Sequence, residues 1–180
     1  MIDIVCFKGE KFNLGFFKIY NFEDFNIVVG GSDNKNRKAL SNKNTDILLS
    51  PEKTRKKDFI HSRNSGLNHV LCKLAKENNI AIGFSFNEIL KSKERNKLIG
   101  RMMQNIKLCR KYKVKMIFAS FAKNKFEMRA AKDLLSFCRV LGMMPKEAKN
   151  ALNQAENIFK KNQERKSKNY IAEGIKIIKA

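Results

Sequence analysis

The chain has 180 residues, which is the size of one domain with a core of its own. Its 38 lysines and arginines outnumber its 17 aspartates and glutamates, so the formal net charge is +21. The uninterrupted apolar runs are too short to span a bilayer, and Asp3 stands where a secretory signal would need positive charge. We therefore expect a single domain over residues 1–180 that acts in the cytoplasm and does not enter a membrane.

Short β-like runs alternate with longer helix-like runs along the chain, as in βα units around a parallel sheet. The expected strands cover residues 2–7, 25–29, 46–49, 80–84, 114–119 and 174–178, and 15–20 is a candidate for a further short strand. Apolar residues at helical spacing predict helices over 64–78, 94–113 and 126–141. Pro145 suits the first turn of another helix that runs through Phe159, and Gly142 is placed to close the preceding helix in a left-handed cap.

The surplus of positive charge favours a polyanionic partner, and we expect RNA. Codon bias in an AT-rich genome is an alternative explanation, because Lys, Asn and Ile are all abundant. Such bias does not explain the shortage of Asp and Glu. A membrane surface is a weaker alternative, since the basic residues recur along the whole chain instead of forming one amphipathic anchor.

The four cysteines lie far apart and form no CxxC pair. Three of them fall on the apolar stripe of an expected helix, whereas metal ligands usually show closely paired spacing. We therefore expect Cys6, Cys72, Cys109 and Cys138 to be reduced and buried, as small apolar residues of the core.

Serines follow four of the expected strands, at Ser32, Ser50, Ser85 and Ser120. In a parallel sheet the carboxyl ends of the strands converge on one rim, where ligands usually bind. A serine before a helix commonly caps free backbone N–H groups, so capping or local turn chemistry is the simpler interpretation of each serine. A polar rim that also meets phosphate is the alternative for the set.

The sequence offers little for hydrolysis of a phosphodiester by the chain's own side chains, which needs a metal cluster or a paired acid and base. His61 and His69 form no His-x-His pair, and neither Asp33 nor Asp58 has a His or Glu at ligand spacing. The glycines at 30–31 match neither a P-loop nor a dinucleotide fingerprint. We expect no catalytic residue and no metal ligand in this chain.

The basic loop, residues 50–69, reads SPEKTRKKDFIHSRNSGLNH. It carries five cations and leads into a helix start that is rich in Asn and Ser; the cations are Lys53, Arg55, Lys56, Lys57 and Arg63. Cations and free N–H groups at a helix start would face the same way, and both suit phosphate oxygens. The alternative is a solvated charged loop without a partner.

Residues 46–90 read DILLSPEKTRKKDFIHSRNSGLNHVLCKLAKENNIAIGFSFNEIL. This run resembles ribonuclease P protein component 3, the archaeal counterpart of the eukaryotic subunit named for its thirty-kilodalton mass. The resemblance continues in the same order through GRMMQN at 100–105, CRKYKV at 109–114, AS at 119–120 and RVLGM at 139–143. Motifs spread over most of the chain are more specific than any single loop.

The resemblance implies a TIM-barrel-like α/β fold, related to the polymerase and histidinol phosphatase superfamily, with a shortened N-terminal part before Val28. It also implies a protein subunit of the ribonuclease P endoribonuclease, which supports removal of the 5′ leader from precursor tRNA. The implied partners are the ribonuclease P RNA, protein component 2, other protein subunits and precursor tRNA. In this family the RNA is the catalyst, so we expect no cofactor in the protein and Mg²⁺ bound through the RNA.

The positions that match basic motifs of the family are Arg55, Lys56, Lys57, His69, Arg95, Arg129 and Lys132. With the loop cations Lys53 and Arg63, they form our candidate RNA- or partner-binding set. The resemblance does not divide them between RNA and protein contacts. A threonine is common in the family where Met144 stands before Pro145, so one expected helix cap is absent.

Two rival functions are distinguishable from this one. A metal-dependent phosphoesterase of the same superfamily would hydrolyse a generic phosphodiester alone, and chelators would abolish that activity. A purely architectural assembly protein would meet component 2 through an apolar face, and reversing the charge of Lys56 and Lys57 would leave its RNA affinity unchanged.

Overall fold

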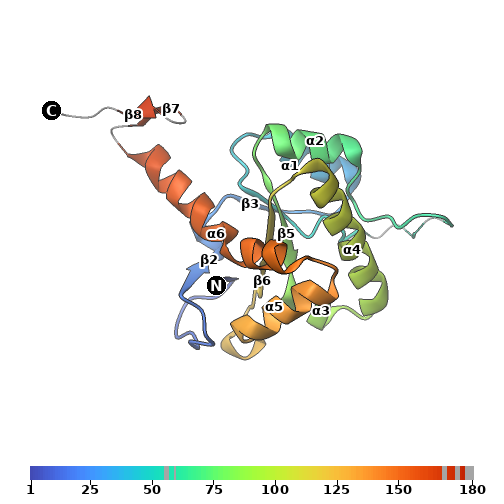
Figure 1. Ribbon diagram of the computed structural model, residues 1–180, viewed down its shortest axis with the longest axis horizontal. Coiled ribbons are helices and arrows are strands. Elements are labelled where there is room, and N and C mark those ends of the chain that lie inside the picture. Colours follow the sequence, from blue (N-terminus) through green and yellow to red (C-terminus); the bar gives the residue numbers. More distant parts are fainter. Residues whose placement is uncertain (55–56, 59, 168–169, 173–174, 177–180) are drawn as a thin grey trace.

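The computed structural model describes residues 1–54, 57–58, 60–167, 170–172 and 175–176, and it shows an α/β fold (Figure 1). Four parallel strands form the main sheet in the order β3 (Ile27–Val29), β4 (Ile47–Leu49), β5 (Ala81–Ser85) and β6 (Met116–Ala119). A second parallel pair joins β1 (Ile2–Val5) to β2 (Lys18–Asn21). The expected parallel α/β sheet is therefore confirmed, including a strand that overlaps the candidate region 15–20.

The strand pair β1–β2 continues the main sheet beyond β6. Phe121 N–H donates to Ile4 O at 2.9 Å, and Cys6 N–H donates to Ala122 O at 2.7 Å. The backbone just after β6 therefore hydrogen-bonds to the backbone at and beyond the end of β1. The parallel strands of the described chain thus follow one another in the order β3, β4, β5, β6, β1 and β2.

The strands do not close into a barrel. Within the described part of the chain, β2 and β3 are not hydrogen-bonded to each other. The 3₁₀ turn Phe22–Asp24 lies in the short segment between them. A parallel pair of consecutive strands needs a crossover of about a dozen or more residues, so this connection is too short. The TIM-barrel-like arrangement that the resemblance implies is therefore not closed among the described strands, and the N-terminal strands leave an open edge.

Six helices of the described chain cover the sheet (Figure 1). The bounds in chain order are α1 (Asp33–Ser41), α2 (His69–Glu77), α3 (Phe86–Lys91), α4 (Arg95–Tyr112), α5 (Ala131–Val140) and α6 (Pro145–Lys166). Helices α1, α2 and α4 pack side by side, and α6 packs against β6 and β1. The predicted helices are confirmed as α2, α4, α5 and α6, although α2 and α5 begin later than expected.

The predicted helix ends near Gly142 and Pro145 are confirmed. Gly142 has φ +90°, its N–H donates to Arg139 O, and Met143 N–H donates to Cys138 O. This double hydrogen bond is the Schellman motif that glycine favours. At the start of α6, Glu147 Oε2 accepts from Met144 N–H at 2.8 Å. That carboxylate satisfies one of the free donors where the family threonine is absent.

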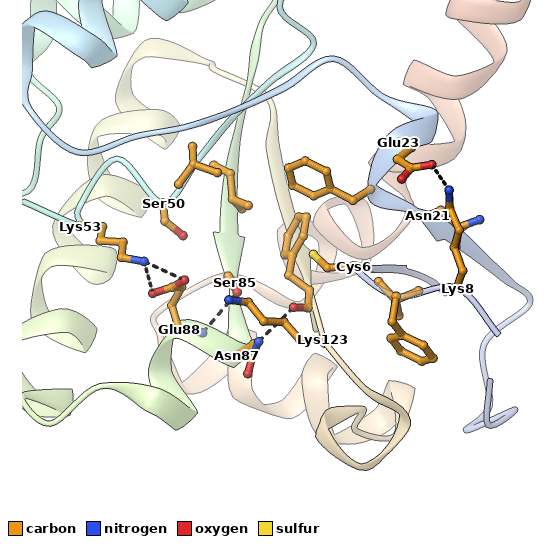
Figure 2. A pocket seen from close by; sticks show the side chains of 16 residues that line it. Cys6, Lys8, Asn21, Glu23, Ser50, Lys53, Ser85, Asn87, Glu88 and Lys123 are labelled. Atoms are coloured by element: carbon orange, nitrogen blue, oxygen red, sulfur yellow. Dashed lines mark hydrogen bonds and ion pairs between the residues drawn. The ribbon is translucent and has the colours of Figure 1, made fainter. Parts of the chain in front are cut away.

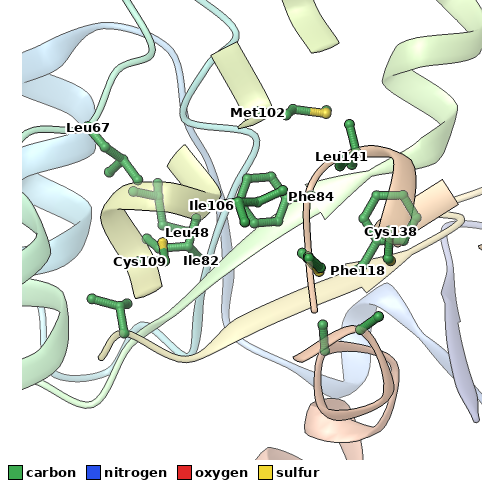
Figure 3. Close-up of a cluster of buried hydrophobic side chains, with 14 of the residues drawn as sticks. Leu48, Leu67, Ile82, Phe84, Met102, Ile106, Cys109, Phe118, Cys138 and Leu141 are labelled. Atoms are coloured by element: carbon green, nitrogen blue, oxygen red, sulfur yellow. The ribbon is translucent and has the colours of Figure 1, made fainter. Parts of the chain in front are cut away.

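Alternate residues of the strands point into two apolar clusters, one on each face of the sheet. On one face, Leu48 and Phe84 pack with residues of α4 and α5, as Figure 3 shows for Met102, Ile106, Cys109, Cys138 and Leu141. On the other face, Ile47 and Ile117 pack with residues of β1, β2 and α6. Burial of both faces explains why these strands read as continuous apolar runs.

All four cysteines are free thiols, as expected, but only three are buried. Cys72, Cys109 and Cys138 belong to the core. Cys6 is exposed, so the expectation of four buried cysteines is wrong for that residue. Its position one residue after β1 explains the difference, since it lies at the rim of the sheet and not within it.

The C-terminal strand does not extend the parallel sheet. Here β7 (Tyr170–Ala172) pairs with β8 (Ile175–Lys176) in an antiparallel arrangement. Residues 174, 177 and 178 of the expected strand lie outside the described residues. None of the helices described is long and apolar enough to cross a membrane.

Candidate nucleic-acid interface

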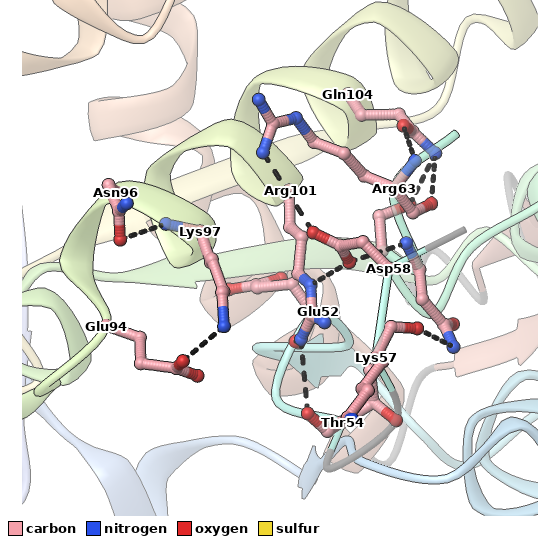
Figure 4. Close-up of polar contacts among 12 residues, drawn as sticks. Glu52, Thr54, Lys57, Asp58, Arg63, Glu94, Asn96, Lys97, Arg101 and Gln104 are labelled. Atoms are coloured by element: carbon pink, nitrogen blue, oxygen red, sulfur yellow. Dashed lines mark hydrogen bonds and ion pairs between the residues drawn. The ribbon is translucent and has the colours of Figure 1, made fainter. Parts of the chain in front are cut away.

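Arg101 of α4 holds the first half of the basic loop through three of its residues. Its Nε donates to Asp58 Oδ1 at 2.7 Å, and its Nη1 donates to the carbonyl oxygens of Thr54 at 3.1 Å and Glu52 at 3.4 Å. Asp58 Oδ1 also accepts from Asn64 N–H at 2.9 Å. Figure 4 shows these contacts between the loop and the helix. A buried arginine therefore fixes the path of the loop against α4.

Two amides of α4 hold the second half of the loop. Gln104 Nε2 donates to Arg63 O and to Ser65 Oγ, each at 3.0 Å. Asn105 Nδ2 donates to Ser65 O at 2.9 Å and to Glu52 Oε2 at 3.3 Å. These bonds tie residues far apart in the sequence, so the described residues of the loop that make them are held against the fold.

The pKa values of two acids in this network are shifted in opposite directions. Burial raises the pKa of Glu52 from 4.5 to about 8, so its carboxyl is largely protonated at neutral pH. Burial also raises the pKa of Asp58, but hydrogen bonds from Asn64 N–H and Arg101 outweigh it, and the pKa lies below the usual value. Asp58 is therefore the anion that balances Arg101, while Glu52 stays neutral.

The described loop cations differ in how far they are engaged. Lys53 forms an ion pair with Glu88 at 3.0 Å, and the side chains are 54% and 31% exposed. The guanidinium of Arg63 lies against Gly100 of α4 and is 4.0 Å from Asp58. Lys57 is exposed. Arg55 and Lys56 lie outside the described residues.

The other candidate residues lie on three different elements. His69 is exposed at the first position of α2, and Lys132 is exposed in the first turn of α5. Arg95 opens α4 and donates to Leu90 O at 2.8 Å. Arg129 donates to the carbonyl oxygens of Phe126 and Met128, so it also organises its own turn. The structure groups Lys53, Lys57 and Arg63 in the loop beside α4 and places Arg129 and Lys132 apart from them.

Apart from Arg95, the candidate set left out the basic residues of α4. This helix contains six basic residues and no acidic residue, at Arg95, Lys97, Arg101, Lys107, Arg110 and Lys111. Lys107 and Lys111 are exposed. Because the basic loop packs on the same helix, we add these two lysines to the candidate interface. The sequence signal that would have identified these two lysines is the presence of basic residues and the absence of acidic residues in the helix.

A second omission is an exposed aromatic cluster before α5. The rings of Phe12 and Phe126 meet edge to face at 6.4 Å, and Lys125 Nζ lies 5.4 Å and 5.5 Å from their centroids. Phe126 is 76% exposed. Aromatic rings beside a cation suit an unpaired base.

The serines after the strands have two different roles. Ser32 and Ser85 cap α1 and α3 by accepting from Lys35 N–H and Glu88 N–H, which confirms the capping interpretation for these two. Ser120 Oγ instead donates to the buried Asp3 at 2.6 Å, and burial raises the pKa of Asp3 to about 6. Ser50 is fully buried and caps no helix. Neither Ser50 nor Ser120 caps a helix. Ser120 Oγ does accept from Ala122 N–H at 3.3 Å, so the expected local turn contact is confirmed for Ser120.

A pocket of about 350 Å³ opens where the strands end (Figure 2). Residues at or just after the carboxyl ends of all six parallel strands line it, from β1 to β6. Across the described ranges, no cluster of three or more His, Cys, Asp or Glu side chains is arranged to hold a metal ion. The pocket walls combine lysine, glutamate, serine, asparagine and phenylalanine side chains with a few aliphatic ones.

Comparison with known proteins identifies the family. The family model of RNase P subunit p30 matches residues 11–167. Ribonuclease P protein component 3 of Methanosarcina acetivorans is 36% identical over 180 residues, covering 98% of this chain and 71% of the relative. The same component of Methanosarcina mazei is 36% identical over 158 residues, covering 86% of this chain and 62% of the relative.

A third relative, from Methanococcoides burtonii, is 33% identical over 179 residues and is covered to 70% of its length. The chain thus spans 62% to 71% of the length of these three relatives. A chain in a cryo-EM structure of archaeal ribonuclease P with mature tRNA has a similar fold. The TM-score is 0.77 and the identity is 22%, with 100% of this chain and 99% of that chain covered.

The resemblance first indicated by residues 46–90 is confirmed by the match over 11–167. The basic loop and its contacts with α4 lie inside the matched region, as do all the candidate RNA- or partner-binding residues. By sequence, this chain belongs to the RNase P subunit p30 family.

Proposed function

We propose that this chain is a protein subunit of ribonuclease P that binds the ribonuclease P RNA and supports removal of the 5′ leader from precursor tRNA. The observation that carries the proposal is the family match over residues 11–167. The net charge of +21 and the contacts that hold described residues of the basic loop against α4 support an RNA-facing role. The names of the relatives, and the ribonuclease P assembly in which the fold recurs, support the same function.

In this proposal the protein shapes the RNA and the RNA carries out the cleavage, in the cytoplasm. Each phosphate neutralised by a lysine or arginine releases condensed counterions. For each tenfold rise in salt concentration, the RNA affinity therefore falls by about 0.7 to 0.9 logarithmic units per contact. Charge neutralisation also lowers the Mg²⁺ concentration that the RNA needs to stay folded. Mg²⁺ acts through the RNA, and the protein holds no cofactor of its own.

The proposed contacts are those of the candidate set. Lys53, Lys57 and Arg63 lie beside α4, where Lys107 and Lys111 add further charge. We propose that different parts of the surface contact RNA, component 2, other protein subunits and the precursor tRNA bound in the complex. We further propose that the six parallel strands derive from a TIM-barrel-like ancestor shared with the polymerase and histidinol phosphatase superfamily, since their carboxyl ends converge on one pocket.

Reconstitution of precursor tRNA cleavage tests the function. The ribonuclease P RNA and the remaining protein subunits are assembled with and without this chain, and the initial rate is measured across a Mg²⁺ titration. We expect the chain to raise the rate and to lower the Mg²⁺ concentration at half-maximal rate. An unchanged rate together with an unchanged Mg²⁺ requirement would overturn the proposal.

A further inference from the structure

The pocket at the strand ends contains polar atoms that have no partner within the part of the chain that the structure describes. Ser50 is fully buried, yet its Oγ forms no hydrogen bond there. Asn87 lines the same pocket and donates from Nδ2 to Phe121 O at 3.2 Å, while its buried Oδ1 is unpaired. Such atoms destabilise the fold unless a ligand or water satisfies them. The pocket therefore suits a polar ligand.

The backbone of the pocket is also unusual. Ser50 has φ 51° and Phe121 has φ 47°, and both residues line the cavity. Left-handed conformations are unfavourable for residues other than glycine and often occur at binding sites. The fold keeps two of them where the ends of β4 and β6 face the cavity.

Three lysines bring positive charge to the pocket, one each after β1, β4 and β6 (Figure 2). Lys8 and Lys53 form ion pairs with Glu23 at 2.7 Å and Glu88 at 3.0 Å. Exposed pairs of this kind contribute little stability, so an anionic ligand can compete for the lysines. The third, Lys123, is exposed, and its Nζ has no partner among the described residues.

The other walls are apolar and aromatic, with Phe22 and Phe121 among them. Aromatic side chains stack on nucleobases, which have an apolar face on every base. The volume of about 350 Å³ lies at the lower end of the range of small-molecule sites. The combination of an aromatic wall, buried hydrogen-bonding atoms and cations is that of a nucleotide site.

We propose that this pocket binds a nucleoside 5′-monophosphate, as a free nucleotide or as the terminal nucleotide of an RNA strand. The phosphate binds Lys53 and Lys123. The base packs against Phe22 and Phe121, and Ser50 Oγ forms a hydrogen bond with the ligand. This site goes beyond the proposed function, although it shares Lys53 with the basic loop.

Calorimetric titration of the purified chain tests the site, with AMP, adenosine and inorganic phosphate as separate probes. We expect AMP to bind saturably and more tightly than either fragment. Lys123→Ala should weaken AMP binding by about tenfold, the usual effect of losing a charged hydrogen bond. Lys149→Ala on α6 removes one exposed lysine away from the pocket and should leave the affinity unchanged.

The source of the nucleotide is read from a second pair of probes. A triribonucleotide with a 5′-phosphate is compared with the same oligonucleotide without it. Tighter binding of the phosphorylated oligonucleotide than of both AMP and the unphosphorylated oligonucleotide identifies an RNA end as the ligand. Equal or weaker binding identifies a free nucleotide.

Cys6 supplies a readout that needs no substitution, because it lines the pocket and is the exposed cysteine of the four. AMP should slow alkylation of Cys6, measured by mass spectrometry. The reaction is run at alkaline pH because partial desolvation raises the pKa of the Cys6 thiol. The site is overturned by failure of both AMP and the phosphorylated oligonucleotide to bind or to protect Cys6. It is equally overturned by equal affinities for Lys123→Ala and Lys149→Ala.

The two proposals fail separately. The titration and the alkylation use the chain alone and report on the pocket. Cleavage in the reconstituted enzyme reports on the subunit role. A chain that stimulates cleavage without binding any nucleotide would retain the proposed function and lose the pocket.

Discussion

At the scale of single residues, the most consequential side chain is Glu52 at the base of the basic loop. It is fully buried, it accepts from Asn105, and burial raises its pKa to about 8. Glu52 Oε1 and Asn105 Oδ1 have no hydrogen-bond partner among the described residues. A protonated carboxyl can donate a hydrogen, so the neutral form suits this surrounding better than the anion.

The parent protein should lose stability as the pH rises to about 8. We predict that Glu52→Gln abolishes this loss. The folded-state pKa of Glu52 is raised, so its contribution is complete below the unfolded pKa of 4.5 and is lost as pH rises to about 8. Above pH 8 the variant should melt at a higher temperature than the parent. Thermal unfolding across this range measures both effects. Parallel melting curves for the two proteins would contradict the raised pKa.

Between pH 6 and pH 8, the effect of Glu52 on stability can be distinguished from that of the second buried acid, Asp3. The pKa of Asp3 is about 6, so its contribution is already lost at higher pH. Repeating the measurement below pH 6 should reveal a dependence that the Gln variant keeps.

Asp3 itself joins β1 to the backbone after β6. It accepts from Ile4 N–H at 2.9 Å, from Ser120 N–H at 2.7 Å and from Ser120 Oγ at 2.6 Å. Asp3→Ala leaves buried donors unpaired and should destabilise the fold by roughly 2 kcal/mol or more. Asp3→Asn keeps an acceptor and adds a donor for the serine hydroxyl, so it should cost less. Chemical denaturation of both variants checks this order, and equal losses would contradict it.

At the scale of elements, the basic loop depends on a close approach of two backbones. Gly66 has φ +74°, and a Cβ there would lie 2.0 Å from Pro51 O. Asn36 Nδ2 bridges the same place by donating to Gly66 O at 2.9 Å and to Pro51 O at 3.3 Å. These hydrogen bonds fix the loop to α1 on one side while α4 holds it on the other.

We predict that Gly66→Ala destabilises the protein far more than Gly142→Ala. Both residues have positive φ, but a Cβ at Gly142 meets nothing within 4 Å. Gly142→Ala should therefore show the backbone cost alone, about 1 kcal/mol, or about 2 to 4 °C in melting temperature. Gly66→Ala adds the clash with Pro51. Comparable melting temperatures for the two variants would show that the loop yields without cost.

The sequence predicted the long apolar elements well because their periodicity is strong. Helix α4 is expected over 94–113 and spans Arg95–Tyr112. Helix α1 is not predicted because Asp33–Ser41 contains only two apolar residues, Ala39 and Leu40, so it has no periodic stripe. Helix α3 is not predicted because six residues are fewer than the window over which periodicity is measured.

At the scale of the whole molecule, the sequence predicted a candidate interface of basic residues but not how the protein itself contacts them. Lys53 and Arg63 are expected as loop cations, and each also contacts the protein itself. The contacts of Arg101 with Glu52 and Asp58 link positions far apart in the sequence. No local pattern of charge or hydrophobicity encodes such pairing, so the buried polar network was beyond sequence reasoning.

We predict that reversing charge beside α4 weakens RNA binding through the salt-dependent part of the free energy. Lys57→Glu combined with Lys107→Glu should lower affinity for ribonuclease P RNA and reduce the slope of log affinity against log salt by about one for each phosphate that is no longer neutralised. Lys146→Glu combined with Lys149→Glu on α6 changes the net charge equally and is the control. Filter binding over a salt series measures the slope. Equal effects of the two pairs would indicate that only total charge matters.

The proposed function requires that this chain reside with ribonuclease P RNA in the cell. The direct measurement is copurification of the tagged full chain from cells, followed by quantification of ribonuclease P RNA against ribosomal RNA. We expect strong enrichment of ribonuclease P RNA that survives moderate salt washes. Recovery of ribonuclease P RNA no higher than in an untagged control, or enrichment of ribosomal RNA to the same degree, would contradict the subunit role.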